Sequence, residues 1–238
     1  MKKIIFALTV LFLFSCSKND KAFFNNINEM DEGILTSEQM KSRERELKNA
    51  INENKEILKQ KVEAARNLKQ YHKMLGKLYL DNKMYLLGAQ EFEEGIKIDT
   101  ENPLLYYYAG LCYARYAKSL TDTTLGLNNM LLAEKYYLKA IEYDKNFTKA
   151  LYAVSVLYVF ELDRPDRACA YLEQLLQTQK TNYDAMFLLA NAYIRLGFTD
   201  KAAAMYDNII KTSKDNIYKK QAEENKKELL NNPFKWVQ

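Results

Sequence analysis

Proline and glycine are scarce in this chain, with three prolines and seven glycines among 238 residues. Both residues interrupt helices, because proline lacks a backbone donor and glycine loses more conformational freedom on ordering than any other residue. A chain poor in both is typical of an almost wholly helical protein. The sequence therefore predicts an all-α fold.

Residues suited to catalysis or metal binding are also few. His72 is the one histidine, and the sequence has no CxxC or HxxH pair, phosphate-binding glycine loop or nucleophile elbow. We expect His72, Cys112 and Cys169 to serve as packing residues, and leave open whether the two cysteines ever pair. We expect no enzyme activity, no metal and no cofactor.

Neither sign of charge dominates the sequence. Lysine and arginine number 35 against 31 aspartates and glutamates, and removal of Lys2 and Lys3 with a leader would leave 33 against 31. Interspersed charges near neutrality create no broad field to attract a phosphate backbone. Nucleic acid is therefore not an expected partner.

Long apolar runs are absent apart from one, which extends from Ile4 to Phe14 after a short basic start. At about 11 residues it is too short to cross a bilayer, which takes ~20, but it has the length of a signal-peptide core. The run ends in Leu13-Phe14-Ser15-Cys16, which resembles a bacterial lipobox.

The lipobox resemblance implies that residues 1–15 are a lipoprotein signal peptide and that Cys16 carries acyl chains such as palmitate. Two or three chains would hold the protein at a membrane without a spanning helix. We expect a bacterial cell envelope protein, and Ser17 favours the outer membrane, with the leaflet left open. An ordinary cleaved signal with an incidental cysteine is the alternative.

The body of the sequence repeats with a period of 34 residues. Four tyrosines stand at intervals of 34, 45 and 35, and three further columns share the intervals 45, 35 and 34. The columns are Gly76, Gly110, Ser155 and Ala190; Tyr79, Tyr113, Tyr158 and Tyr193; Gly88, Ala133, Ala168 and Ala202; Phe92, Tyr137, Leu172 and Tyr206; Gly95, Ala140, Leu175 and Ile209. All five columns fit the 34-residue period if one insertion of 11 residues and another of one residue are allowed.

Each repeat predicts two short helices. A small residue three positions before a tyrosine lies on the same helical face, and the second helix repeats this arrangement at i, i+4 and i+7. Neither helix can bury that face alone, whereas stacked hairpins can. We expect the 11-residue insertion to lengthen the first helix of the second repeat, with a turn near Thr121–Gly126 and a delayed second helix.

These stretches resemble the tetratricopeptide repeat family. The carrying segments are LGKLYLDNKMYLLGAQEFEEGIKID from Leu75, YYYAGLCYARY from Tyr106, LLAEKYYLKAIEYD from Leu131 and LLANAYIRLGFTDKAAAMYDNII from Leu188. The resemblance covers 71–216 and implies an α-solenoid of four units, 71–102, 103–147, 148–182 and 183–216. It departs from the family in lacking the proline that closes each repeat.

Helical segments are predicted on both sides of the repeats. After a tether over 16–35, a helix over 36–70 begins with Thr36 and Gln39 in capping-box spacing. It carries an apolar stripe that predicts either a coiled coil or, preferably, docking on the first repeat as a cap. The stripe is Met40, Leu47, Ile51, Leu58, Val62, Ala65 and Leu68. Residues 217–238 predict a capping helix and an aromatic tail around Trp236.

First helices line a concave groove in the family, so the helical period gives the groove-facing positions. The candidate binding residues are Lys73, Lys77, Tyr107, Arg115, Lys149, Tyr152, Phe160, Phe187, Asn191 and Arg195. Asn191 and Arg195 lie one turn apart and suit a peptide amide and a carboxylate. A merely solvated face is the alternative.

The sequence as a whole predicts a membrane-anchored adaptor or scaffold that binds a protein or peptide partner in the envelope. The alternative is an accessory subunit of a solute transport or outer-membrane assembly system, which binds a small ligand or a partner subunit. Homo-oligomers are compatible with either function.

Overall fold

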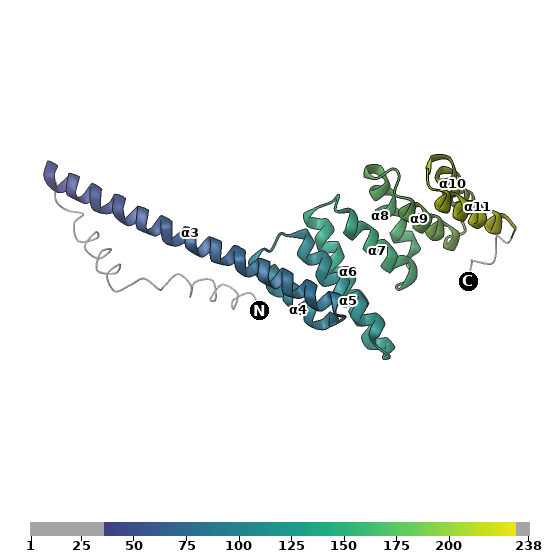
Figure 1. Ribbon diagram of the computed structural model, residues 1–238, viewed down its shortest axis with the longest axis horizontal. Coiled ribbons are helices and arrows are strands. Elements are labelled where there is room, and N and C mark those ends of the chain that lie inside the picture. Colours follow the sequence, from purple (N-terminus) through teal and green to yellow (C-terminus); the bar gives the residue numbers. More distant parts are fainter. Residues whose placement is uncertain (1–35, 232–238) are drawn as a thin grey trace. The chain divides into compact units, whose positions relative to one another are not determined.

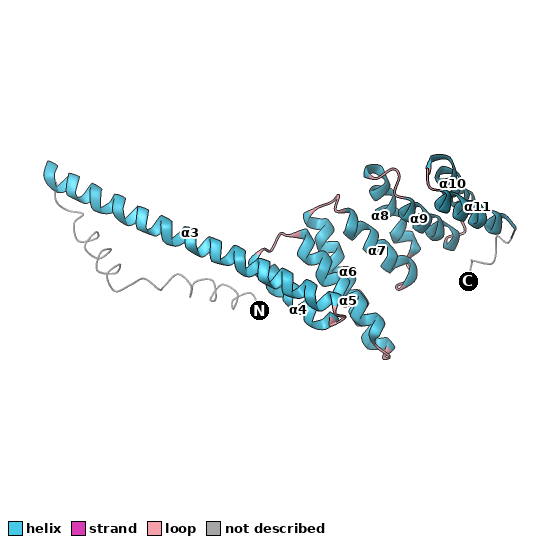
Figure 2. Cartoon of the chain, viewed as in Figure 1, coloured by secondary structure: helices cyan, strands magenta, loops and turns pink. Residues whose placement is uncertain are grey.

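The computed structural model describes residues 36–231. Within this range the chain forms nine helices and no strand (Figures 1 and 2). The predicted all-α repeat solenoid is therefore confirmed. The predicted signal peptide, Cys16 with its tether and the tail from Pro233 lie outside the described residues.

The helices from α4 onward form a succession of hairpins. The bounds are α3 Ser37–Asp81, α4 Tyr85–Ile98, α5 Pro103–Ser119, α6 Thr123–Tyr143, α7 Thr148–Phe160, α8 Pro165–Thr178, α9 Tyr183–Arg195, α10 Thr199–Thr212 and α11 Asn216–Asn231. Each helix from α4 to α10 packs against the next one, and α5 also contacts α7, as α7 contacts α9. The first helices of the repeats therefore form the inner layer.

Helix α3 is longer than the sequence predicted. It begins with the predicted capping box, in which Thr36 N donates to Gln39 Oε1 at 2.9 Å and Gln39 N donates to Thr36 Oγ1 at 3.3 Å. It then continues to Asp81, with no break at residue 70. Because neither proline nor glycine occurs between Thr36 and Leu75, nothing in the sequence ends the helix there. The end of α3 is the first helix of the first repeat.

The expectation that the apolar stripe docks as a cap is wrong. Met40, Ile51 and Leu58 are 59%, 52% and 61% exposed. Val62 and Leu68, which belong to the same compact unit as the repeats, are also 51% and 49% exposed, so this part of the stripe does not dock on the first repeat.

Small residues let the two helices of a repeat approach closely. A Cβ atom added to Gly110 would lie 2.8 Å from ring atoms of Tyr137, and one added to Gly76 would lie 3.0 Å from the ring of Phe92. Ser155 and Ala190 occupy the same column and are fully buried. The small column of each first helix thus makes room for the bulky column of its second helix.

Tyrosine hydroxyls form hydrogen bonds between consecutive repeats. The repeat columns placed these tyrosines on a buried face but did not predict the hydrogen bonds. Tyr113 donates to Glu93, and Tyr193 donates to Glu173, each at 2.7 Å. Tyr136 also donates to Glu93, at 2.5 Å. Glu93 is half-buried and accepts from two hydroxyl donors.

The third connection has a shifted acceptor. Tyr158 donates to Glu134 at 2.7 Å, and Glu134 is 9% exposed. Arg164 and Arg167 approach the same carboxylate at 3.3 Å and 3.4 Å. Burial and the bond to Glu134 raise the pKa of Tyr158 well above its usual range.

The 11-residue insertion extends both helices of the second repeat. Helix α5 has 17 residues against 13 in α7 and α9, and α6 has 21 against 14 in α4, α8 and α10. The four and seven extra residues account for the whole insertion. The turn lies at 120–122. Helix α6 begins 20 residues after the start of α5, against 17 and 16 residues for the second helices of the next two repeats, so the predicted longer first helix and delayed second helix are both present. Asp122 caps α6 by accepting from Leu125 N at 2.9 Å.

Helix α11 closes the array as predicted. It packs against α10, buries Ala222 and Leu229, and leaves Ile217 76% exposed. The two cysteines of the described region are free, Cys112 buried and Cys169 half-buried. Burial raises the pKa of Cys112 to about 12, so its thiol stays neutral and packs as an apolar group. His72 Nδ1 lies 2.7 Å from Glu91 Oε2.

Gly110→Ala should destabilise the protein by about 1–3 kcal/mol, because the added methyl overlaps the Tyr137 ring. Gly126→Ala is the matched control, since its Cβ would meet only Ala117 O, at 3.5 Å. There the usual preference of helices for alanine should stabilise by ~0.5 kcal/mol. Urea unfolding followed by circular dichroism measures both, and equal effects would contradict the close-approach account.

Tyr158→Phe should cost about 1.5 kcal/mol at pH 8 through the lost bond to Glu134. The raised pKa means that this tyrosine stabilises the fold fully below pH ~10 and loses that contribution as pH rises towards its folded value. The free energy of unfolding should therefore fall with pH less steeply in the variant, by about 1.4 kcal/mol per pH unit. Urea unfolding at pH 8, 10 and 11 tests this, with exposed Tyr71→Phe as control.

Candidate functional site

The inner layer carries a cavity of about 290 Å³ between the second and third repeats. Its walls come from α5, α6 and α7, and are mostly apolar or aromatic. The lining residues are Tyr107, Leu111, Ala114, Arg115, Lys118, Met130, Tyr137, Tyr152, Ala153, Val156, Leu157 and Glu161.

The charged side chains at this cavity differ in whether they already have an ion-pair partner. Lys118 Nζ lies 2.6 Å from Glu161 Oε1, which pairs both groups. Arg115, in contrast, is exposed and has no ion-pair partner within residues 36–231. Burial raises the pKa of Tyr107, and Arg115 partly offsets the rise. The cavity therefore offers neutral hydroxyls and one available guanidinium.

A second cavity, of about 350 Å³, adjoins the first along the same layer. It is built from α7, α9, α10 and α11, and Tyr152 lines both cavities. The lining residues are Tyr152, Phe160, Asp184, Phe187, Leu188, Asn191, Tyr206, Gln221 and Asn225. Asn191, Tyr206 and Asn225 also line a smaller hollow of about 90 Å³. We call this connected surface the inner groove.

Asn191 is the unusual polar group of the inner groove. Its side-chain oxygen is buried and accepts no hydrogen bond within the described part of the chain. A buried acceptor without a partner costs about 1–3 kcal/mol, so such atoms are rare in folded proteins. A donor that enters the groove would satisfy it.

Six of the ten predicted binding residues line the inner groove, namely Tyr107, Arg115, Tyr152, Phe160, Phe187 and Asn191. The other four line none of the three hollows. Lys77 pairs with Asp81 at 3.4 Å on α3, and Lys149 is exposed at the start of α7. Lys73 is half-buried on α3.

Arg195 has a different place from the one the sequence predicted. Its guanidinium donates to the carbonyl of Val159 and, at 2.8 Å, to Asp163 Oδ1. Asp163 lies in the turn between α7 and α8 and has a φ of +50°, a backbone conformation that non-glycine residues adopt at some cost. Arg195 therefore stabilises that turn, and its guanidinium is already occupied by these two acceptors rather than available for a ligand.

Residues of α11 were missed because the sequence assigned that helix only a capping role. Gln221 and Asn225 stand 34 residues after Phe187 and Asn191, which is one repeat period. Both line the inner groove. Extending the period by one step past the fourth repeat would have found them.

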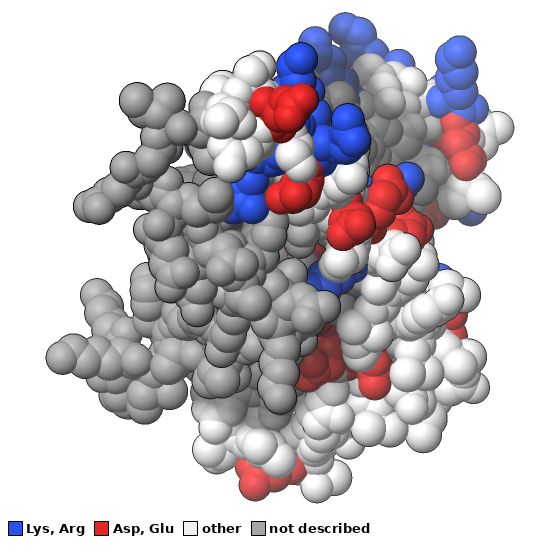
Figure 3. Space-filling view, turned by 90° about the vertical axis from the view of Figure 1, so that its left-hand side faces the viewer, with Lys and Arg blue, Asp and Glu red and all other residues white. Residues whose placement is uncertain are grey.

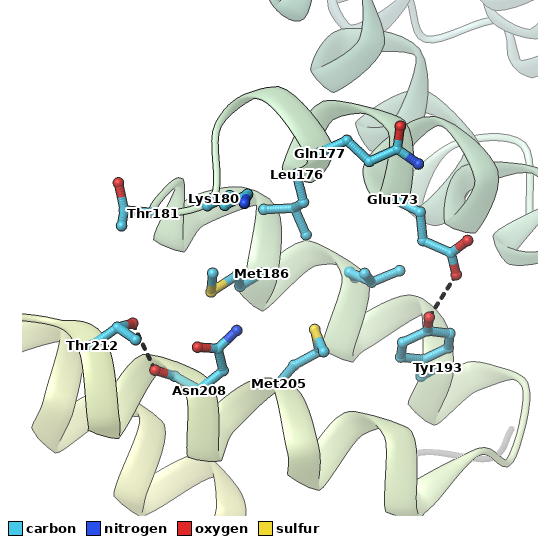
Figure 4. A pocket seen from close by; sticks show the side chains of 11 residues that line it. Glu173, Leu176, Gln177, Lys180, Thr181, Met186, Tyr193, Met205, Asn208 and Thr212 are labelled. Atoms are coloured by element: carbon cyan, nitrogen blue, oxygen red, sulfur yellow. Dashed lines mark hydrogen bonds between the residues drawn. The ribbon is translucent and has the colours of Figure 1, made fainter.

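A further cleft, of about 630 Å³, lies among α8, α9 and α10 (Figure 4). Leu176 of α8 and Met205 of α10 point towards each other across it, and the Tyr193–Glu173 bond closes one end. None of the candidate residues lines this cleft. It differs from the inner groove in that second helices, rather than first helices, form most of its walls.

The described residues contain no cluster of three or more metal-ligating side chains. Likewise, no helix within 36–231 is both long and apolar enough to cross a membrane. Basic and acidic side chains lie next to one another on the described surface seen in Figure 3, so that view shows no broad field of one sign.

Known proteins resemble this chain in sequence and in fold. A family model described as "Tetratricopeptide repeat" matches residues 159–223. A "TPR repeat-containing protein" of Borreliella burgdorferi is 26% identical over 159 residues, which cover 67% of this chain and 69% of that protein.

Two solved structures share the arrangement of helices. The structure of MamA, residue 41 to the end, from Desulfovibrio magneticus RS-1 has a TM-score of 0.54 at 13% identity, over 71% of this chain and 94% of that one. YrrB, described as a TPR protein with an unusual peptide-binding site, has a TM-score of 0.53 at 21% identity, over 75% and 88% of the two chains. The family match, the relative and the shared helix arrangement thus support the resemblance to tetratricopeptide repeat proteins that the columns predicted.

Arg195→Ala should destabilise the protein by about 1–3 kcal/mol, because the Val159 carbonyl and the Asp163 carboxylate lose a charged donor. Lys149→Ala removes an exposed charge on the same layer and should change stability by less than ~0.5 kcal/mol. Urea unfolding of the two variants provides the comparison. A neutral Arg195→Ala would show that the guanidinium is available for a ligand after all.

Proposed function

We propose that this protein is a membrane-anchored adaptor that binds an extended segment of a partner protein in its inner groove. The carrying observation is the buried, unpartnered oxygen of Asn191 in a groove that runs from α5 to α11. A folded protein retains such an atom at a cost in stability. A hydrogen-bond donor of a bound ligand would satisfy this oxygen, which would explain why the protein keeps it unpaired.

The groove chemistry indicates what kind of segment fits. An extended peptide exposes backbone N–H groups, one of which can donate to Asn191. Its apolar side chains can enter the two hollows on either side of Tyr152, against Leu111 and Val156 in one and Phe187 in the other. Burial raises the pKa of Tyr152, so its hydroxyl remains a neutral donor.

Arg115 adds a preference for an acidic group. It is exposed at the first hollow without an ion-pair partner in the described region, and guanidinium binds carboxylates in a bidentate geometry. We therefore expect the bound segment to place an acidic side chain or a C-terminal carboxylate near α5, and apolar side chains towards α9.

The fold supports this proposal, since YrrB is described as a TPR protein with a peptide-binding site. The groove offers hydrogen-bond partners and apolar walls rather than a nucleophile with an adjacent base, so we propose binding without turnover. The anchor is proposed from Leu13-Phe14-Ser15-Cys16, with acyl chains on Cys16 at the outer membrane of a bacterial envelope.

The alternative is an accessory role in solute transport or outer-membrane assembly. A small organic ligand would occupy one hollow, whereas a peptide segment would contact both. Partner identity therefore separates the two possibilities more directly than affinity does.

The test is in-cell cross-linking from a photoreactive amino acid placed at Tyr152, with the same amino acid at Asn208 on α10 as the matched position outside the groove. One envelope protein captured from position 152 and absent from position 208 supports the adaptor. Equal capture at both positions, or none, contradicts it. Cys16→Ser in the same cells should move the protein out of the membrane fraction.

Asn191→Leu should abolish capture from position 152 while leaving the free energy of unfolding unchanged or raising it by ~1 kcal/mol, since a buried unpaired acceptor disappears. Asn208→Leu, outside the groove, should leave capture intact. Capture that survives Asn191→Leu would show that this oxygen takes no part in binding.

A further inference from the structure

The N-terminal part of α3 presents a narrow apolar row that is exposed along its length. Met40, Leu47, Ile51 and Leu58 follow one another at steps of seven, four and seven residues and are 38–61% exposed. With 3.6 residues per turn, these steps keep the four side chains within about 20° of one line along the helix. The row therefore forms one continuous edge on a part of the helix whose other positions are mostly polar or charged, with exposed Ile57 as the large apolar exception.

Basic residues border this row. Lys41, Lys48, Lys55 and Lys59 fall on one side of it by the helical period, and Arg43 falls on the other. Glu44 is the acidic residue nearest the row, and its carboxylate pairs with Lys48 at 2.5 Å. Arg43 pairs with Glu46 at 3.2 Å, and Lys59 with Glu56 at 3.7 Å.

Acidic residues gather on the opposite half of the helix. Four of the five glutamates between residues 37 and 60 lie there, together with Arg45; they are Glu38, Glu46, Glu53 and Glu56. The helix is thus apolar at one edge, basic beside that edge and acidic at the back.

This order of charges distinguishes between possible occupants of the row. An antiparallel second copy paired along the row would bring the lysine borders of two helices together, and like charges side by side oppose association. In a parallel pair, polar Asn54 and Lys61, at the next two steps of seven after Leu47, would interrupt the apolar seam. An anionic lipid surface has the complementary charge. Lysine stems can lie along the apolar boundary while their ammonium groups reach the headgroups.

We propose that this part of α3 lies on an anionic phospholipid surface, with the Met40–Leu58 row inserted at the level of the headgroups. The acyl anchor proposed at Cys16 would assist, because Met40 lies only 24 positions after Cys16. A fully extended chain of that length reaches at most ~85 Å. This inference uses the anchor of the proposed function only as a tether, and the contact itself depends on α3.

The contact is tested with an environment-sensitive fluorescent amino acid at Ile51, in the row, or at Glu53, on the acidic side. The full acylated chain is reconstituted with vesicles of phosphatidylcholine alone or of phosphatidylcholine with 30% phosphatidylglycerol. We expect a blue shift of the emission at position 51 only with phosphatidylglycerol, and none at position 53. Both positions are exposed, so the substitutions should leave folding intact.

Charge variants give the matched control. Lys55→Glu, beside the row, should weaken the blue shift, and raised salt should weaken it further because the attraction is screened. Arg45→Glu makes the same change in charge on the opposite side and should leave the shift in place. If both variants lose the blue shift equally, the shift depends only on the net charge of the helix, and the proposed orientation is wrong.

The remaining outcomes separate the lipid contact from the anchor. A blue shift at position 51 without any vesicles would mean that another copy covers the row, and would overturn the proposal. Protein retained on vesicles by its acyl chains, with no shift at position 51, would overturn it while the anchor stands. A shift in a chain that proves to carry no acyl group would support the contact and remove the anchor.

Discussion

The hydrogen bond from a first-helix tyrosine to a glutamate of the preceding repeat is the contact on which the rest of the array depends. Hydrophobic packing pulls hairpins together without direction, whereas a hydroxyl aimed at a carboxylate fixes how far one hairpin rotates on the next. Tyr113–Glu93 and Tyr193–Glu173 are separated by 20 residues along the chain. At Tyr158 the acceptor, Glu134, stands 24 residues earlier. The third repeat therefore has the same kind of hydrogen bond, with an acceptor about one helical turn further back along the second helix.

The inner groove follows from this registration of the hairpins. Because α5 contacts α7 and α7 contacts α9, one side chain, Tyr152, can line two hollows at once. Arg195 supports the arrangement from the side by holding the turn that contains Asp163. The hollows and the unpartnered oxygen of Asn191 are already formed without a partner, so the proposed peptide segment would need little further ordering of the groove when it binds.

The protein divides its proposed interactions between two surfaces of opposite design. The inner groove is concave and mostly apolar, with few polar groups, which suits a defined peptide segment. The start of α3 is a convex helix face with an apolar row and a basic border, which suits a fluid and chemically simple surface. Because neither surface requires the other, partner binding and membrane contact can be altered by separate substitutions.

The sequence by itself determined the repeat architecture, since a small residue three positions before a tyrosine, repeated every 34 residues, has one packing solution: stacked hairpins. It also predicted which face of α5, α7 and α9 points inward, and six groove residues follow from that period. Tertiary structure alone decided that Arg195 holds the turn at Asp163 and that Glu93 and Glu134 accept hydrogen bonds from tyrosines. These depend on distances between side chains from different repeats, and helical periodicity gives the direction of a side chain but not what lies opposite it.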